Sequence, residues 1–208
     1  MRVCPYGDQG DAEDGDDRAG RDHRARPGRT GDVLQDLGES RILATSCRSR
    51  AFSWLDAARF CNSLSEREGL TPAYQLHADV EGSEWEASAD GYRLPTEAEW
   101  EHACRAGTTG ARYGQLDEIA WYRGNSDERI HDVGGKEPNP WGLHDMLGNV
   151  WQWCWDVYDA EVYATYRVLR GGGWYDERWS CRASVRRRSR PTFQIDDVGL
   201  RIARSRLS

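Results

Sequence analysis

The spacing of apolar and polar residues divides the chain into three parts. Residues 1 to 50 show no regular apolar pattern, whereas residues 51 to 107 contain two stretches with the apolar period of a helix. From residue 113 onward, short apolar or aromatic pieces lie between turn-forming Gly, Asn, Asp and Pro. This succession predicts two helices followed by many short strands.

The first helix is predicted to begin directly after Phe52. Ser53 and Asp56 have the spacing of an N-terminal capping pair, and Gly69 marks the end of the helix. The apolar residues in between recur on one helical face, and they are Trp54, Ala57, Ala58, Cys61 and Leu64. Cys61 is therefore expected to be a buried apolar residue and not a reactive thiol.

The second helix is predicted between Thr96 and Gly107. Thr96 and Glu99 form a capping box, and Glu97 and Glu99 suit the positive end of the helix dipole. The inward face contains Trp100, Ala103 and Cys104. The glutamates could serve as acid–base groups, but capping accounts for them without chemistry.

The remaining elements are short. Residues 71–76 are expected to be extended, and residues 79–90 to form a loop. Six pieces are predicted as strands, at residues 119–122, 141–143, 150–155, 166–169, 181–185 and 198–202. The last one alternates, with Val198, Leu200 and Ile202 on one side and Arg201 on the other, as a half-buried strand does. Two helices, many short strands and long ordered loops indicate an irregular α+β domain.

The N-terminal segment 1–50 interleaves acidic residues with arginines and has hardly any aromatic residue. Such a composition cannot bury enough apolar surface to offset chain entropy. The segment is expected to be disordered or atypical, so that an ordered domain occupies residues 51–206. An apolar patch could still form a brief helix or strand, and it consists of Val33, Leu34, Leu37, Ile42 and Leu43.

Composition limits the function classes. The chain has 208 residues, which suits one domain, and ten Trp and nine Tyr compensate for a lean apolar fraction of 38%. A net charge of −7 argues against a general polyanion binder, so nucleic acid is not an expected partner. The run Arg186–Arg188 with Arg190 is a local exception, interpreted as paired or solvated strand-end arginines.

No apolar run reaches the length of a membrane span, and the N-terminus lacks the apolar core of a signal peptide. A cytoplasmic location without membrane contact is therefore expected. Six cysteines show neither a Cys-x-x-Cys spacing nor a disulfide framework, so reduced thiols are expected.

A glycine triplet, Gly171–Gly173, precedes the most unusual loop of the chain. Glycine permits sharp turns and close approach, and the loop then places Trp174, Tyr175 and Trp179 among charged residues. Two interpretations stay open: the loop forms a recognition or reaction surface, or its tryptophans merely pack against the fold.

Four blocks of sequence carry a family resemblance. They are YRLPTEAEWE at 92–101, NPWGLHDMLGNVWQW at 139–153, RGGGW at 170–174 and GLR at 199–201. In this order, they resemble the formylglycine-generating enzymes, also called sulfatase-modifying factors, over a stretch from about Phe52 to Arg204. The resemblance implies an irregular relative of the C-type lectin fold, and it suggests an oxygen-dependent oxidase-type domain that acts on a protein or on a thiol-containing small molecule.

The resemblance also indicates where chemistry would occur. In sulfatase-activating members, two cysteines after the double glycine bind copper and convert a substrate cysteine to formylglycine. Their positions correspond here to Asp176 and Cys181, and Gly173 stands where a serine is usual. A lone thiolate is a poor site for Cu(I), which prefers soft ligands, so copper and formylglycine formation by the two-cysteine mechanism are not expected. Cys181 and Asp176 remain the catalytic candidates, and the substrate-binding candidates are Trp174, Tyr175, Trp179 and Arg182.

The same resemblance also concerns two other metals, iron and calcium. Related sulfoxide synthases hold iron on a separate helical domain with a His-x-x-x-His-x-Glu motif, which is missing here, so iron would need ligands from a partner domain or chain. Residues 145–152 resemble a calcium loop, with ligands from Asp145, Gly148, Val150 and Gln152, and oxygen ligands suit this hard cation. Gln152 replaces the usual glutamate and should weaken binding. The alternative is a turn in which Asp145 and Asn149 satisfy backbone donors.

Three functional hypotheses follow. The chain is a diverged oxidase with Cys181 as its candidate thiolate, a non-catalytic C-type-lectin-like binding module that uses residues 174–190, or a protein kept only for its fold. Stiff aromatic residues flanked by arginine favour the binding module, because such side chains dominate binding hot spots.

Overall fold

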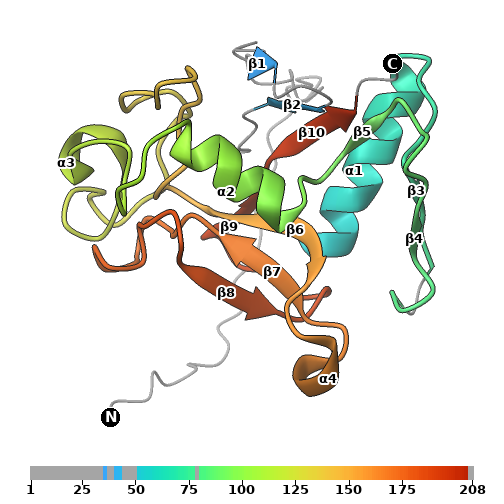
Figure 1. Cartoon of the computed structure of the whole chain (residues 1–208). Coiled ribbons are helices and arrows are strands. Elements are labelled where there is room, and N and C mark those ends of the chain that lie inside the picture. Colours follow the sequence, from blue (N-terminus) through green and yellow to red (C-terminus); the bar gives the residue numbers. More distant parts are fainter. Residues whose placement is uncertain (1–34, 37–39, 44–50, 78–79, 206–208) are drawn as a thin grey trace, which may run out of the picture.

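The computed structural model describes residues 35–36, 40–43, 51–77 and 80–205 (Figure 1). Three residues of the predicted apolar patch lie outside these ranges: Val33, Leu34 and Leu37. Within segment 1–50, the described residues are 35–36 and 40–43. The described chain is mixed helix and strand with long irregular connections, which confirms the predicted α+β class.

Both predicted helices are present and begin as their sequences require. Helix α1 spans Trp54–Arg67, and the Ser53 hydroxyl accepts the Asp56 N–H at 3.1 Å. Helix α2 spans Glu97–Arg105, and Thr96 and Glu99 form the reciprocal capping box. The predicted inner faces are confirmed, because Trp54, Ala57, Ala58, Cys61, Trp100, Ala103 and Cys104 have no exposed surface. Two single-turn helices follow, α3 at Leu116–Ile119 and α4 at Ala160–Tyr163.

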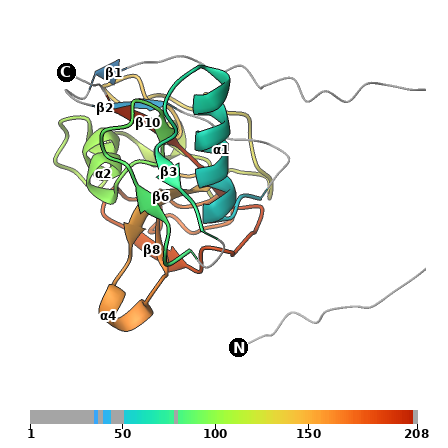
Figure 2. The same ribbon diagram turned by 90° about the vertical axis from the view of Figure 1, so that its right-hand side faces the viewer.

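The central sheet has the order β8-β7-β6-β9. Its strands are β6 at Trp151–Val157, β7 at Arg167–Arg170, β8 at Arg186–Ser189 and β9 at Val198–Leu200. Strand β9 runs parallel to β6, whereas β7 is antiparallel to both β6 and β8. Helix α2 packs on β6 and β7, and α4 projects from one end of the molecule in both views (Figures 1 and 2).

A second sheet has the order β1-β2-β10-β5. It consists of β1 at Gln35–Asp36, β2 at Ser40–Leu43, β5 at Tyr92–Arg93 and β10 at Ile202–Ser205. A separate hairpin joins β3 at Tyr74–Gln75 to β4 at Glu84–Trp85. Strand β2 pairs with β10 along its whole length, so part of the segment for which disorder or an atypical structure was expected adds a strand to this sheet.

The prediction of one half-buried strand at 198–202 is wrong in two respects. The strand divides at Arg201 into β9 and β10, which belong to different sheets. Arg201 itself is only 2% exposed. Its guanidinium lies inside the protein and hydrogen-bonds to Gln152 and to backbone carbonyls, which explains why a charged residue is buried at this position.

Three other strand predictions are also wrong. At 119–122, Ile119 ends α3 and residues 120–122 have no regular structure; residues 141–143 form a turn, and residues 181–185 are irregular and precede β8. The predicted loop 79–90 contains the short strand β4. By contrast, the strands expected at 150–155 and 166–169 correspond to β6 and β7.

The core is built largely from aromatic rings. Tyr74 stacks on Trp155 with 4.4 Å between ring centroids, and Trp54 donates its indole N–H to the Cys154 carbonyl at 3.0 Å. The Arg167 guanidinium lies 4.0 Å from the centroid of the Trp54 ring, and burial lowers the pKa of Arg167 to about 10. None of the described helices has both the length and the apolar surface that crossing a bilayer requires.

Candidate functional site

The glycine triplet forms a turn that only glycine can make. Strand β7 ends at Arg170, and Gly171 and Gly172 follow with φ values of +102° and +85°. A Cβ added to Gly172 would lie 3.0 Å from the Cys181 sulfur. The turn therefore brings the backbone directly against the predicted catalytic thiol, as a side chain at either position would not allow.

The carboxylate of Asp176 fastens the loop that follows. One oxygen, Oδ2, accepts the Trp151 indole N–H at 2.6 Å and the Gly173 backbone N–H at 2.9 Å. A Cβ on Gly173 would lie 3.2 Å from this same oxygen and 3.2 Å from the Cβ of Asp197. A serine, which the family resemblance leads one to expect at Gly173, would crowd this contact, so glycine and aspartate fit together here.

The loop backbone is held from several sides. Trp174 N–H donates to the Asn149 carbonyl at 2.8 Å, and Arg123 N–H donates to the Asp176 carbonyl at 3.0 Å. The Arg112 guanidinium binds two further loop carbonyls, those of Arg178 at 2.5 Å and Cys181 at 2.7 Å. These contacts come from segments distant in sequence, and they fix the loop in one conformation.

The predicted substrate-binding residues divide into two groups. Tyr175 is 53% exposed and Trp179 is 60% exposed, and Arg182 is exposed beside Trp179, whose carbonyl accepts the Arg182 Nε–H at 2.7 Å. Trp174 is half-buried, and its indole nitrogen is buried without a hydrogen-bond partner. Arg123 adds a cation 5.3 Å from the Tyr175 ring centroid, so the outer surface combines aromatic and cationic side chains.

Cys181 has no exposed surface, and its thiol is unreactive in this environment. Burial raises the pKa of Cys181 to about 12, the nearby Asp176 charge raises it further, and Arg112 only partly opposes the shift. Since the thiolate is the nucleophile, a buried and protonated thiol does not serve this role. Cys181 and Asp176 together do not fit a Cu(I) ion, which prefers soft ligands, because they offer one sulfur and a carboxylate whose Oδ2 already accepts two hydrogen bonds.

The segment resembling a calcium loop lies beneath the glycine turn. Asp145, Gly148 and Asn149 have positive φ values of 54°, 75° and 63°. The Asp145 carboxylate accepts the Gly134 N–H at 2.7 Å, and Asn149 Oδ1 accepts the His131 N–H at 3.0 Å. Burial raises the pKa of Asp145. Both side chains thus bind backbone donors, as the turn interpretation requires.

Both polar atoms of the Gln152 side chain bind protein groups. Its Oε1 accepts the Trp100 indole N–H at 2.8 Å and Arg201 Nε–H at 2.7 Å, while its Nε2 donates to the Asp145 carbonyl at 2.7 Å. Arg201 Nη2 donates to the same carbonyl at 3.1 Å and to that of His144 at 2.9 Å. Of the predicted ligands, Gln152 Oε1 thus accepts from Trp100 and from a guanidinium, and the Asp145 carboxylate accepts from Gly134, so these two side chains do not fit a calcium ion.

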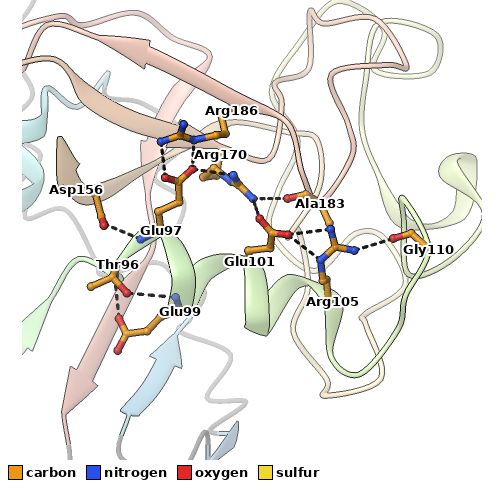
Figure 3. Close-up of polar contacts among 10 residues, drawn as sticks. All are labelled: Thr96, Glu97, Glu99, Glu101, Arg105, Gly110, Asp156, Arg170, Ala183 and Arg186. Atoms are coloured by element: carbon orange, nitrogen blue, oxygen red, sulfur yellow. Dashed lines mark hydrogen bonds and ion pairs between the residues drawn. The ribbon is translucent and has the colours of Figure 1, made fainter. Parts of the chain in front are cut away.

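The sequence did not predict the network of ion pairs around Arg170. Arg170 is 1% exposed and binds Glu97 at 2.8 Å, Glu101 at 2.6 Å and the Ala183 carbonyl (Figure 3). Arg186 holds the other side of Glu97, and Arg105 holds Glu101. A hollow of about 600 Å³ opens over this network, but each of its arginines already has a carboxylate partner.

The sequence also does not single out Asp197 as a residue of the site, because nothing in its local sequence distinguishes it. Its backbone carbonyl accepts the Trp151 N–H at 2.7 Å, and its carboxylate lies 3.5 Å from Arg187. Burial raises the pKa of Asp197, Arg187 opposes this, and Asp176 adds to it. In the part of the chain that the structure describes, no three His, Cys, Asp or Glu side chains gather as a metal site would require.

Sequence comparison places this geometry among known proteins. The profile of the sulfatase-modifying factor enzyme 1-like domain matches residues 50–206. The chaperone protein LppX of Paenibacillus barcinonensis is 29% identical over 191 residues, which cover 74% of this chain and 68% of that protein. The formylglycine-generating enzyme of Streptomyces coelicolor is 34% identical over 54% of this chain and 46% of its own length. The serine/threonine-protein kinase pkn1 of Chlamydia pneumoniae is 36% identical over 68% of this chain, but the match spans about a quarter (26%) of the kinase.

Two solved structures have the same architecture. Treponema denticola variable protein 1 superposes with a TM-score of 0.70 and 27% identity, covering 80% of this chain and 84% of that one. CarF superposes with a TM-score of 0.66 and 30% identity, covering 75% and 67% of the two chains. These similarities confirm the fold expected from the four sequence blocks.

Proposed function

Because the chain belongs to the sulfatase-modifying factor enzyme 1-like family, we propose that its domain recognises a protein partner and does not catalyse a reaction. The binding surface is the segment from Trp174 to Arg182, which we call the recognition loop. The observation that carries this proposal is the exposure of Tyr175 and Trp179, at 53% and 60%, on a loop whose backbone is fixed from several sides.

A fixed loop with exposed rings has the properties of an efficient binding surface. Little conformational entropy is lost when a preorganised loop binds, and tyrosine and tryptophan offer large contact area with few rotatable bonds. The exposed Arg182 and the Arg123–Glu177 pair, 3.1 Å apart, add polar groups at the edge of the aromatic surface. Apolar rings surrounded by polar groups are the usual arrangement of a protein–protein hot spot.

The alternative activity is a diverged oxygen-dependent oxidase that acts on a protein or a thiol-containing small molecule. It would need an accessible thiolate at Cys181 and a free carboxylate at Asp176. The buried thiol has a pKa of about 12, and the carboxylate binds two protein donors, so the recognition role agrees better with the geometry.

A photo-crosslinking experiment tests the proposal in cells that naturally produce the protein. A benzophenone amino acid replaces Trp179, and in a matched control it replaces Phe60, which is 36% exposed on α1. The expected result is one protein partner captured from position 179, not from position 60, and lost when Tyr175→Ala is added. Equal capture from both positions would contradict the proposal.

A second assay addresses the oxidase directly. Purified protein is incubated with Cu(I) in air together with a Cys-x-Pro-x-Arg peptide, and a second sample is prepared with Cys181→Ser. The expected result is no stoichiometric copper and no change in peptide mass in either sample. A mass change that depends on Cys181 would overturn the recognition role.

A further inference from the structure

The exposed edge of the central sheet carries a row of arginines. Strand β8 is the last strand of the β8-β7-β6-β9 sheet, and it pairs on one side with β7. Arg186 and Arg188 lie in β8 and Arg190 directly follows it; the three occupy alternate positions and are all exposed, whereas Arg187 and Ser189 between them are half-buried. We call these three exposed residues the arginine row.

Tyrosine rings from the segment around α4 hold this row in place. The Arg188 guanidinium carbon lies 3.7 Å from the Tyr163 ring centroid, and that of Arg186 lies 4.4 Å from the Tyr158 centroid. Arg190 donates its Nε–H to the Tyr166 hydroxyl at 3.0 Å. Stacking occupies the flat face of a guanidinium and leaves N–H groups at its edge, so the arginines are oriented without being saturated.

The row has unused charge. Arg186 is paired with Glu97 at 2.6 Å, but no carboxylate among the described residues lies within ion-pair distance of Arg188 or Arg190. The whole chain carries a net charge of −7, so this cationic edge contrasts with the molecule around it. A long polyanion would be repelled by the rest of the protein, whereas a short acidic segment would meet only the row.

We infer that β8 binds an acidic peptide in extended conformation, which adds as a further strand to the sheet and pairs its carboxylates with Arg188 and Arg190. Edge strands present backbone groups that an incoming strand can use. Alternate residues of a strand are about 6.6 Å apart, so acidic residues at every second peptide position match the spacing of the row. Arginine can bind each carboxylate with two parallel hydrogen bonds.

This inference rests on the proposed recognition function and names the chemistry of the partner. The chain runs directly from the recognition loop through residues 183–185 into β8. A partner that presents an acidic strand to β8 would therefore continue toward Trp179, where apolar contacts are available. Backbone pairing and charge would supply the register, and the aromatic loop would supply the buried area.

The test uses the purified full-length chain and a fluorescent synthetic heptapeptide with glutamate at its second, fourth and sixth positions and threonine or valine between them. Fluorescence anisotropy measures its affinity. Two control peptides carry glutamine in place of glutamate, or N-methyl groups on alternate backbone amides. The Arg188→Gln and Arg190→Gln double variant is compared with Arg59→Gln and Arg67→Gln, which removes two exposed positive charges from α1.

The expected result is saturable binding of the acidic peptide, weakened about 10- to 100-fold by the β8 double variant and less than about twofold by the α1 variant. Both control peptides should bind at least about tenfold more weakly. Equal binding of the glutamine or N-methylated peptide would overturn strand addition, and tighter binding of a short DNA duplex would overturn the peptide as ligand. If the peptide fails to bind but Tyr175→Ala still abolishes the crosslink at position 179, only this inference fails. If the peptide binds and that crosslink is unaffected, the recognition loop is refuted instead.

Discussion

Replacing Arg170 should be among the most damaging single changes at the base of the recognition loop. The guanidinium is 1% exposed and binds Glu97, Glu101 and the Ala183 carbonyl (Figure 3). It also lies 5.0 Å from the Trp100 ring centroid. Arg170→Met keeps much of the volume and removes all three charge-assisted hydrogen bonds.

The magnitude follows from what remains after the substitution. Removing one partner of a buried ion pair costs about 3–5 kcal/mol when the other charge is left unpaired. Here Glu97 keeps Arg186 and Glu101 keeps Arg105, which reduces the loss, but the Ala183 carbonyl loses the Arg170 hydrogen bond. We therefore expect the free energy of unfolding to fall by about 3 kcal/mol for Arg170→Met. Arg170→Lys keeps the charge but cannot span the three acceptors, so it should lose about half as much.

Urea denaturation followed by tryptophan fluorescence measures this loss. With a denaturant slope of about 2 kcal/mol per molar, the midpoint should fall by about 1–2 M for Arg170→Met. Arg186→Met is the matched control, because Arg186 shares Glu97 but its side chain is 39% exposed, so its loss should stay below about 1 kcal/mol. Equal losses for the two variants would refute the reasoning that burial decides the cost.

The network also has a predicted pH dependence. Burial alone would raise the pKa of Glu101, but hydrogen bonds from Arg170 and Arg105 outweigh it, so the pKa lies below its usual value. A carboxyl with a lowered pKa contributes stability above its unfolded pKa of about 4.3 and loses it as the pH falls through the folded value. The difference in stability between wild type and Arg170→Met should therefore be constant near neutral pH and shrink in acid.

The remaining predictions concern the loop and the turn beneath it. Iodoacetamide at pH 8 should leave Cys181 unmodified in the folded protein and alkylate it after denaturation, because a pKa of about 12 leaves roughly one thiol in 10⁴ ionised; rapid labelling of the native state would contradict this. Asp176→Ala should lower the free energy of unfolding by about 2 kcal/mol and speed hydrogen exchange of the loop amides, since Gly173 and Trp151 lose their acceptor. Asp176→Asn should have a smaller effect on both. The Tm of the wild type should be the same in calcium and in a chelator, because the side-chain oxygens of Asp145 and Gln152 already accept hydrogen bonds from protein donors. A calcium response of the wild type would show that our geometric argument fails.

The sequence predicts those parts of the fold that neighbouring residues determine. Both capping boxes lie within four residues, and the buried helical faces follow from one periodic pattern, so both helices are found where expected. The strands expected at 150–155 and 166–169 follow from short apolar runs near turn-forming residues, and both lie in the central sheet. The strand predicted at 119–122 does not form, because Ile119 ends the single turn of α3, which is too short to display a helical period, and residues 120–122 are irregular.

The environment of Arg201 could not be predicted, because it depends on contacts that are distant in sequence. Local alternation predicts an exposed arginine on a half-buried strand. Its real partners, Gln152 and the carbonyls of His144 and Asp145, are about fifty residues away. The sequence identifies Tyr175 and Trp179 as candidates for recognition, but only the structure separates these exposed rings from the half-buried Trp174.

Two of the departures from the family pattern, at Asp176 and Gln152, have the same physical effect. Where the resemblance implies a cysteine, Asp176 accepts hydrogen bonds from Trp151 and from the backbone; where it implies a glutamate, Gln152 donates to a carbonyl and accepts from Arg201. In each case a group suited to bind a metal is replaced by one that is satisfied by the protein itself. Among the residues singled out in the recognition loop, the exposed aromatic and arginine side chains are then the ones available for binding.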